Sequence, residues 1–196
     1  MKKSILVALF VASIGGAGAN EIYIEQVGSG STVTVTQEGA DNRIGTALNP
    51  ANIGSGSNTV VIDQIGSNNQ LDMVVNGTAT DVTVNITGST NTSTIDCGTT
   101  TSAGCSGSTI TQIVTGDNNT LTQNLGTGAN HVSTFNITGD TNTVTHTSTA
   151  SATTSADITV IGNTNTVSVT QSGMLNQNVV VSSTGDLNNV TIVQSD

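Results

Sequence analysis

The sequence predicts an all-β protein, a β-solenoid of about seven to eight strand-turn-strand coils with parallel sheets stacked in register. Three observations point to this fold. A phrase of eleven residues recurs from Asn20 to the end of the chain, side chains alternate with period two within each phrase, and Gly, Asp and Asn separate the phrases. Two phrases make a unit of about 22 residues, a size at which coils stack as solenoids.

The recurring phrase is a small amide or hydroxyl residue, five residues, Gln, one residue, Gly and two residues. It is complete where it begins at Ser31, Asn58 and Asn165, and partial elsewhere. Most steps are eleven or twelve residues long, which gives about fifteen phrases. They begin at residues 20, 31, 42, 58, 69, 80, 91, 106, 119, 130, 142, 154, 165, 176 and 188.

Each phrase reads as one strand and one turn. From Ser31 to Gln37, Val33 and Val35 point to one side and the intervening Thr residues point to the other, as in a half-buried strand. Gly two residues after the Gln permits positive φ, and the Asp and Asn that follow favour tight turns.

The first nineteen residues predict a secretory signal peptide. Lys2 and Lys3 precede an apolar run from Ile5 to Ile14, and the segment ends in small residues at 17–19. We therefore expect a leader at 1–19 and one solenoid domain at 20–196, in a protein that is secreted.

Three longer steps predict insertions in the solenoid, at 43–57, 98–105 and 147–153. The second contains a loop between Cys97 and Cys105, the two cysteines of the chain. In a secreted protein this pair predicts a disulfide. A metal site would need further ligands, and a redox pair is more often Cys-x-x-Cys.

The charge of the chain excludes some partners. Its formal net charge is −10, and removal of the leader leaves Arg43 against thirteen acidic residues, a net charge of −12. Nucleic acid and anionic membranes attract cationic faces, so neither is an expected partner. Beyond the leader, no apolar stretch approaches the roughly 18 residues needed for membrane insertion.

Inward strand positions hold Val, Ile and Leu, but also Asn, Ser and Gln, whose burial without a partner would cost about 1 to 3 kcal/mol each. In a solenoid, such residues lie above their counterparts and can bond along the axis as amide ladders. We expect a structural ladder, with its turn glycines, at Asn20, Gln26, Gly28, Ser31, Gln37, Gly39, Asn42, Asn58, Gln64, Gly66, Asn69, Asn165, Gln171, Gly173, Asn176, Asn188 and Gln194.

These residues resemble the curlin repeat, the unit of the curli amyloid-fibre subunits of bacterial biofilms. The resemblance extends over residues 20 to 196. It matches the inward apolar positions Ile22, Ile24, Val33, Val35, Val60, Ile62, Val167 and Val169, and the ladder positions Gln26, Gln37, Gln64, Gln112, Gln171 and Gln194. The sequence departs from the pattern at Val75, Ile86 and Cys97, which stand in the Gln place, and at Gln123, which lies two residues early.

The resemblance implies a structural subunit of an extracellular curli-like fibre, or pilus, at the bacterial cell surface, which supports adhesion and biofilm matrix. It also implies secretion through a dedicated pore, and as partners other copies of the chain with a related nucleating or major subunit. Solenoid ends template further strands. We expect the phrases at 20–42 and 165–196 to dock end to end.

Acidic residues at Asp63, Asp72 and Asp96 occupy outward strand positions and resemble gatekeepers against lateral association. An alternative is Ca²⁺ binding at Gly-Asp turns, but calcium-binding rolls need a nine-residue period that is absent here. Ordinary Asx turns explain these residues better, and no cofactor or metal is expected.

Catalysis has no support in the sequence, and we do not expect an enzyme. His131 and His146 lack a neighbouring triad or metal motif. The period-two pattern places His146 inward and His131 outward, and favours a structural role for both.

An ice-binding β-solenoid is an alternative, because Thr-x-Thr rows occur at 32–36, 109–111, 120–122 and 143–145. The equivalent places in other phrases carry Tyr23 and Glu25, Val61 and Asp63, or Gln70 and Asp72, so the rows are not expected to persist from coil to coil. A monomeric adhesin or phage-fibre solenoid is a further alternative.

Overall fold

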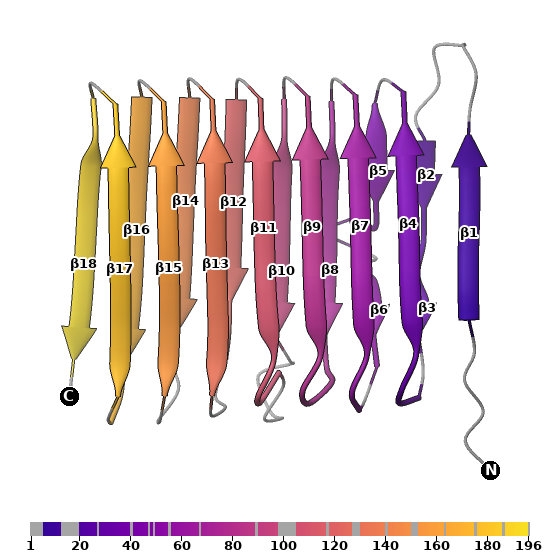
Figure 1. Cartoon of the computed structure of the whole chain (residues 1–196), viewed down its shortest axis with the longest axis horizontal. Coiled ribbons are helices and arrows are strands. Elements are labelled where there is room, and N and C mark those ends of the chain that lie inside the picture. Colours follow the sequence, from indigo (N-terminus) through magenta and orange to yellow (C-terminus); the bar gives the residue numbers. More distant parts are fainter. Residues whose placement is uncertain are drawn as a thin grey trace.

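The computed structural model of the chain is a β-solenoid of two facing sheets (Figure 1). The structure describes residues 6–12, 20–26, 28–39, 41–46, 48, 50–54, 56–66, 68–88, 90–97, 105–116, 118–126, 130–139, 141–149, 153–162, 164–174, 176–185 and 187–195. All regular elements in these ranges are strands, and none is a helix that could span a bilayer.

Sheet A contains eight parallel strands. In spatial order they are β1 (Leu6–Ala12), β4 (Thr32–Glu38), β7 (Thr59–Ile65), β9 (Asp81–Thr87), β11 (Thr109–Thr115), β13 (His131–Thr138), β15 (Thr154–Ile161) and β17 (Gln177–Thr184).

Sheet B lies opposite and is also parallel. Its main path is β2 (Asn20–Ile22), β5 (Asn42–Ile44), β8 (Gln70–Val75), β10 (Thr92–Cys97), β12 (Asn118–Asn124), β14 (Thr141–Ser148), β16 (Thr164–Ser172) and β18 (Asn189–Ser195). Two short strands, β3 (Glu25–Gln26) and β6 (Ala51–Ile53), continue the lines of β2 and β5.

From β2 onward the chain alternates between the sheets, so a strand from each makes one coil, and seven coils run from β4 to β18. The strands pair in register, for example Val33 with Val60 and Val60 with Val82. Their inward apolar side chains form a single narrow core. The predicted fold class is therefore confirmed.

Three phrases begin later than the sequence spacing suggests. Thr109 pairs with Asp81, so the phrase assigned to residue 106 begins at Ser108, and Gln112 aligns with Val84 rather than with the Gln place. His131 and Gln177 both pair with Thr154 and begin their phrases one residue late. A shift of one residue reverses every side chain.

Strands overlap two of the predicted insertions. β5, Asn42–Ile44, overlaps the start of the 43–57 segment, and β6, Ala51–Ile53, lies inside it. Within 147–153, the first two residues belong to β14 and residues 150–152 lie outside the described ranges, as do 98–104. In the full chain, Leu6–Ala12 of the predicted leader pairs with β4 at the end of sheet A (Figure 1).

Candidate assembly interface

One long edge of the solenoid repeats a single turn. Each described turn from a sheet A strand to a sheet B strand has Gly followed three residues later by Asn, and we call these turns the Gly-Asn edge. The turns begin at Gly39, Gly66, Gly88, Gly116, Gly139, Gly162 and Gly185.

The glycines of the Gly-Asn edge stack too closely to carry a side chain. A Cβ on Gly66 would lie 1.5 Å from the carbonyl oxygen of Gly39, and a Cβ on Gly162 would lie 1.5 Å from that of Gly139. Backbone bonds tie the same turns together, for example from the Gly66 N–H to the Thr87 carbonyl at 2.9 Å. The Gly-Asn edge therefore requires Gly, because a side chain would not fit between the stacked turns. The distance between these turns sets the repeat of the coils.

The asparagines of the Gly-Asn edge form an amide ladder that runs the length of the described solenoid. The side-chain nitrogen of each Asn donates to the side-chain oxygen of the Asn one coil earlier. The distances are 2.8 Å for Asn69 to Asn42, 2.6 Å for Asn91 to Asn69, 2.6 Å for Asn119 to Asn91, 2.7 Å for Asn142 to Asn119, 2.7 Å for Asn165 to Asn142 and 3.3 Å for Asn188 to Asn165.

The predicted Gln ladder positions are less regular than the Asn ladder. Gln64 donates to the Gln37 side chain at 2.9 Å, and both are buried. Ile86 then follows in that column of sheet A. In sheet B, Gln171 and Gln194 pair in register, whereas Gln26 bonds within its own turn, to the Ser31 hydroxyl at 3.0 Å.

Other predicted ladder residues lie at strand ends and turns. Asn20 pairs in register with Asn42, and Asn58 accepts the Ser31 N–H at 3.2 Å. Asn176 does not join the ladder, because it lies exposed in a turn with φ of 55°. Gly28 and Gly173, with φ of 116° and 102°, lie in turns on the opposite edge.

His131 and His146 are both buried, so the expectation that His131 points outward is wrong. The reason is the shifted start of β13 described above. The His146 ring meets Phe135 edge to face at 6.3 Å between centroids. Burial lowers the pKa of His146 to about 4, the Gln171 amide opposes this shift, and the charge of His131 adds to it.

The described residues contain no group of three or more His, Cys, Asp or Glu placed to hold a metal ion. Cys97 and Cys105 form a disulfide with their Cα atoms 5.2 Å apart, on the edge opposite the Gly-Asn edge.

Outward acidic residues bond to amides of the next coil. Asp63 accepts from Asn85 at 2.6 Å and Asp96 accepts from Asn124 at 2.6 Å. Asp72 stands in an outward place but is buried, and accepts from Gln70 at 2.7 Å.

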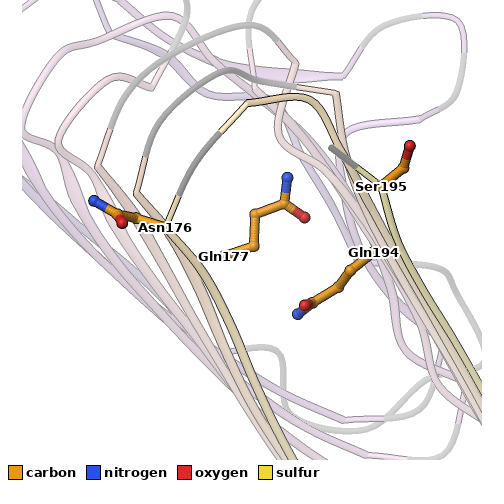
Figure 2. Close-up of a pocket in the computed structure, with 4 residues that line it drawn as sticks. All are labelled: Asn176, Gln177, Gln194 and Ser195. Atoms are coloured by element: carbon orange, nitrogen blue, oxygen red, sulfur yellow. The ribbon is translucent and has the colours of Figure 1, made fainter.

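The last coil, β17 and β18, exposes side chains that are covered in the coils before it. Val167 and Val169 of β16 have no exposed surface, whereas Val190 and Ile192, which pair with them, are 41% and 47% exposed. A hollow of about 380 Å³ opens between the two strands. Gln177 and Gln194 face each other across it, while Asn176 points away from it (Figure 2).

The uncovered side of β17 and β18, which we call the end face, carries the same kinds of inward side chain as the interior coils but has no coil packed on it. Its column of side chains continues the Asn ladder through Asn188 and the apolar core through Val179 and Val181. Unpaired strand edges of this kind accept further strands.

Comparison with known proteins identifies one family repeat in the chain. No curated protein sequence and no solved structure shows a significant match to the chain. A family model described as the curlin associated repeat matches residues 17–39, the segment from before β2 to the first glycine of the Gly-Asn edge. The predicted resemblance is thus confirmed, and these residues carry a curlin-associated repeat.

Proposed function

We propose that this chain is the structural subunit of an extracellular curli-like amyloid fibre that grows by end-to-end addition of copies. The observation that carries the proposal is the uncovered coil of β17 and β18, where inward Val190 and Ile192 are half-exposed. A second copy that adds strands to both sheets would bury this layer and extend the backbone pairing.

Fibre growth in this proposal uses the contacts that join the coils inside one chain. Parallel pairing, apolar contacts and the Asn ladder would continue across the joint. With about 4.8 Å per coil, seven coils contribute roughly 34 Å of fibre length. The outward Asp63 and Asp96 keep a negative surface between neighbouring fibres, which limits lateral association.

The place of action follows from the leader. We propose that residues 1–19 direct export, that the mature chain begins at Asn20, and that the fibre forms at the bacterial surface, where it supports adhesion and biofilm matrix. A secretion pore and a nucleating or major fibre subunit are the partners proposed by family resemblance. No enzymatic activity is part of the proposal.

A thioflavin T time course with electron microscopy tests the proposal on protein secreted from the full-length gene. We expect fibres after a lag, and growth without a lag when preformed fibres are added. The double variant Val179→Asp/Val181→Asp, which charges the inward side of β17, should fail to elongate. The control Asn178→Asp/Val180→Asp charges the outward side of the same strand and should elongate. A persistently monomeric, β-rich wild-type protein would overturn the proposal.

Ice binding is a second candidate, favoured by one observation. Outward Thr and Ser residues align on four successive strands of sheet B, β10, β12, β14 and β16, while Gln70 and Asp72 interrupt the same columns on β8, as expected. Thr92, Thr120, Thr143 and Thr166 form one column, and Thr94, Thr122, Thr145 and Ser168 form the next.

Thermal hysteresis tests this second candidate. If the rows bind ice, the monomer should depress the freezing point, and Thr143→Tyr should reduce this effect while Thr111→Tyr on the outer face of sheet A leaves it intact. Absence of hysteresis in the wild-type monomer would exclude the function.

A further inference from the structure

The number of strands creates a problem at the joint between two copies. From Asn20 onward, the first phrase, β2 with β3, lies in sheet B, and so does the last strand, β18. In the full chain β1 completes the first coil beside β4. Without residues 1–19, as the proposed function requires, sheet B has one strand place more than sheet A.

Simple stacking of such copies would leave sheet A incomplete. If β18 of one copy paired with β2 of the next, β17 and β4 would be separated by an empty strand place. Both strands would then present unpaired N–H and C=O groups inside the fibre, and buried backbone groups are almost always paired.

The first phrase, β2 with β3, is the least regular strand of sheet B. β2 and β3 contribute three and two residues, and they pair with a line that is itself split into β5 and β6. β18 is a continuous strand of seven residues, all paired in register with β16. β18, which would join one copy to the next, is therefore better formed than the β2 and β3 segment with which it would pair.

The two segments also carry the same inward pattern. The first phrase places Asn20, Ile22, Ile24 and Gln26 in alternate positions, and the last places Asn188, Val190, Ile192 and Gln194 in the same order. Ile22 pairs with Ile44, and Gln26 pairs with Ile53. β18 of another copy could therefore replace the first phrase on β5 and β6 position by position.

We infer that, in fibre growth, β18 of a second copy displaces residues 20–26 from β5 and β6. β17 then pairs with β4, both sheets are continuous, and every copy contributes the seven complete coils from β4 to β18. The displaced segment carries Glu21, Tyr23 and Glu25, which are already exposed, and leaves the core at each joint.

A disulfide lock tests the exchange. Glu21 and Arg43 pair across β2 and β5. Paired residues of neighbouring strands lie about 4.8 Å apart, within the Cα range of about 4.4 to 6.8 Å that disulfides accept. The variant Glu21→Cys/Arg43→Cys fixes the first phrase in place when oxidised. Its control, Thr143→Cys/Thr166→Cys, locks the equivalent pair between β14 and β16.

In seeded elongation of the secreted mature protein, we expect the oxidised terminal lock to slow growth roughly tenfold or more. The oxidised internal control should grow like the wild type. Equal growth of both locked variants would overturn the exchange while leaving the fibre proposal intact. Failure of the wild type itself to form fibres would overturn the proposed function instead.

A pair of identical substitutions gives a second test that does not depend on disulfide formation. Ile24 and Ile192 occupy equivalent places in the first and last phrases, and both are partly covered in the isolated chain. We expect Ile192→Asp to abolish seeded growth, because this residue enters the joint. Ile24→Asp should keep the growth rate unchanged or raise it, because Ile24 is displaced from the joint between the copies. Equal loss in both variants would contradict the exchange.

Discussion

The two long edges of the solenoid differ in how strictly they repeat. The Gly-Asn edge uses the same turn in every described coil, with a fixed interval of three residues from Gly to Asn. The opposite edge contains the disulfide between Cys97 and Cys105 and connections of unequal length. A solenoid thus needs one edge to fix the coil spacing, and the other edge can then vary.

The difference has a physical cause in the contacts along the axis. On the Gly-Asn edge, backbone approaches backbone closely enough to exclude a Cβ, and buried amides bond from coil to coil. Any residue inserted on the Gly-Asn edge would break the close backbone contact and the amide bond in two coils. The opposite edge is less uniform: Gly28 and Gly30 have open space around the position of a Cβ, whereas a Cβ on Gly77 would lie 2.6 Å from the carbonyl oxygen of Gly56.

The largest expected effect is from a methyl group on the Gly-Asn edge. In Gly139→Ala the new Cβ would lie 1.6 Å from the Gly116 carbonyl oxygen. Strain and displaced backbone should lower the free energy of unfolding of the monomer by more than about 3 kcal/mol in urea titration. Gly30→Ala, at φ of 72° but with no neighbour, should cost only about 1 to 2 kcal/mol. Similar losses would contradict the asymmetry of the edges.

Interruption of the Asn ladder should have the next largest effect. Asn142→Leu removes the donor to Asn119 and the acceptor of Asn165, both buried. Each group left without a partner costs about 1 to 3 kcal/mol, so we expect a loss of about 3 kcal/mol in the same titration. Asn178→Leu, at an exposed outward position of β17, is the control. A ladder variant as stable as this control would show that the amides do not bond.

A pH effect is expected from the buried histidine near the opposite edge. The pKa of His146 falls from its usual 6.5 to about 4 in the fold, so the unfolded chain binds a proton in this interval and the folded chain does not. Stability is therefore full above pH 6.5 and declines as the pH falls toward 4, by about 2 kcal/mol at pH 5.

The measurement is urea unfolding at pH 7 and pH 5, in the wild type and in His146→Gln. The variant should lose this decline, because it lacks the imidazole. An equal decline in both proteins would show that His146 does not titrate as its burial requires.

The smallest effect is expected on the outer face. Asn124→Ala removes the exposed amide bond to Asp96 and should change the free energy of unfolding by less than about 1 kcal/mol. The same titration measures it, and a loss as large as that of Asn142→Leu would show that the outward pairs fix the register as well.

The sequence predicted the solenoid because period-two alternation and recurrent Gly-x-x-Asn spacing are local signals, visible without knowledge of packing. Four asparagines of the Asn ladder, Asn42, Asn69, Asn165 and Asn188, were among the predicted ladder positions. Asn91, Asn119 and Asn142 were not, because complete phrases draw attention to Gln. The better signal was Asn at every second phrase start, at 20, 42, 69, 91, 119, 142, 165 and 188. The start of β13 could not be predicted, because Asn130 fits the phrase while pairing with β15 places His131 there.

Diffraction from aligned fibres shows whether copies stack coil upon coil along the solenoid axis. The account predicts a sharp reflection at about 4.7 to 4.8 Å along the fibre axis, with a sheet-packing reflection near 10 Å perpendicular to it. Fibres whose 4.7 to 4.8 Å reflection lies perpendicular to the fibre axis would contradict end-to-end stacking.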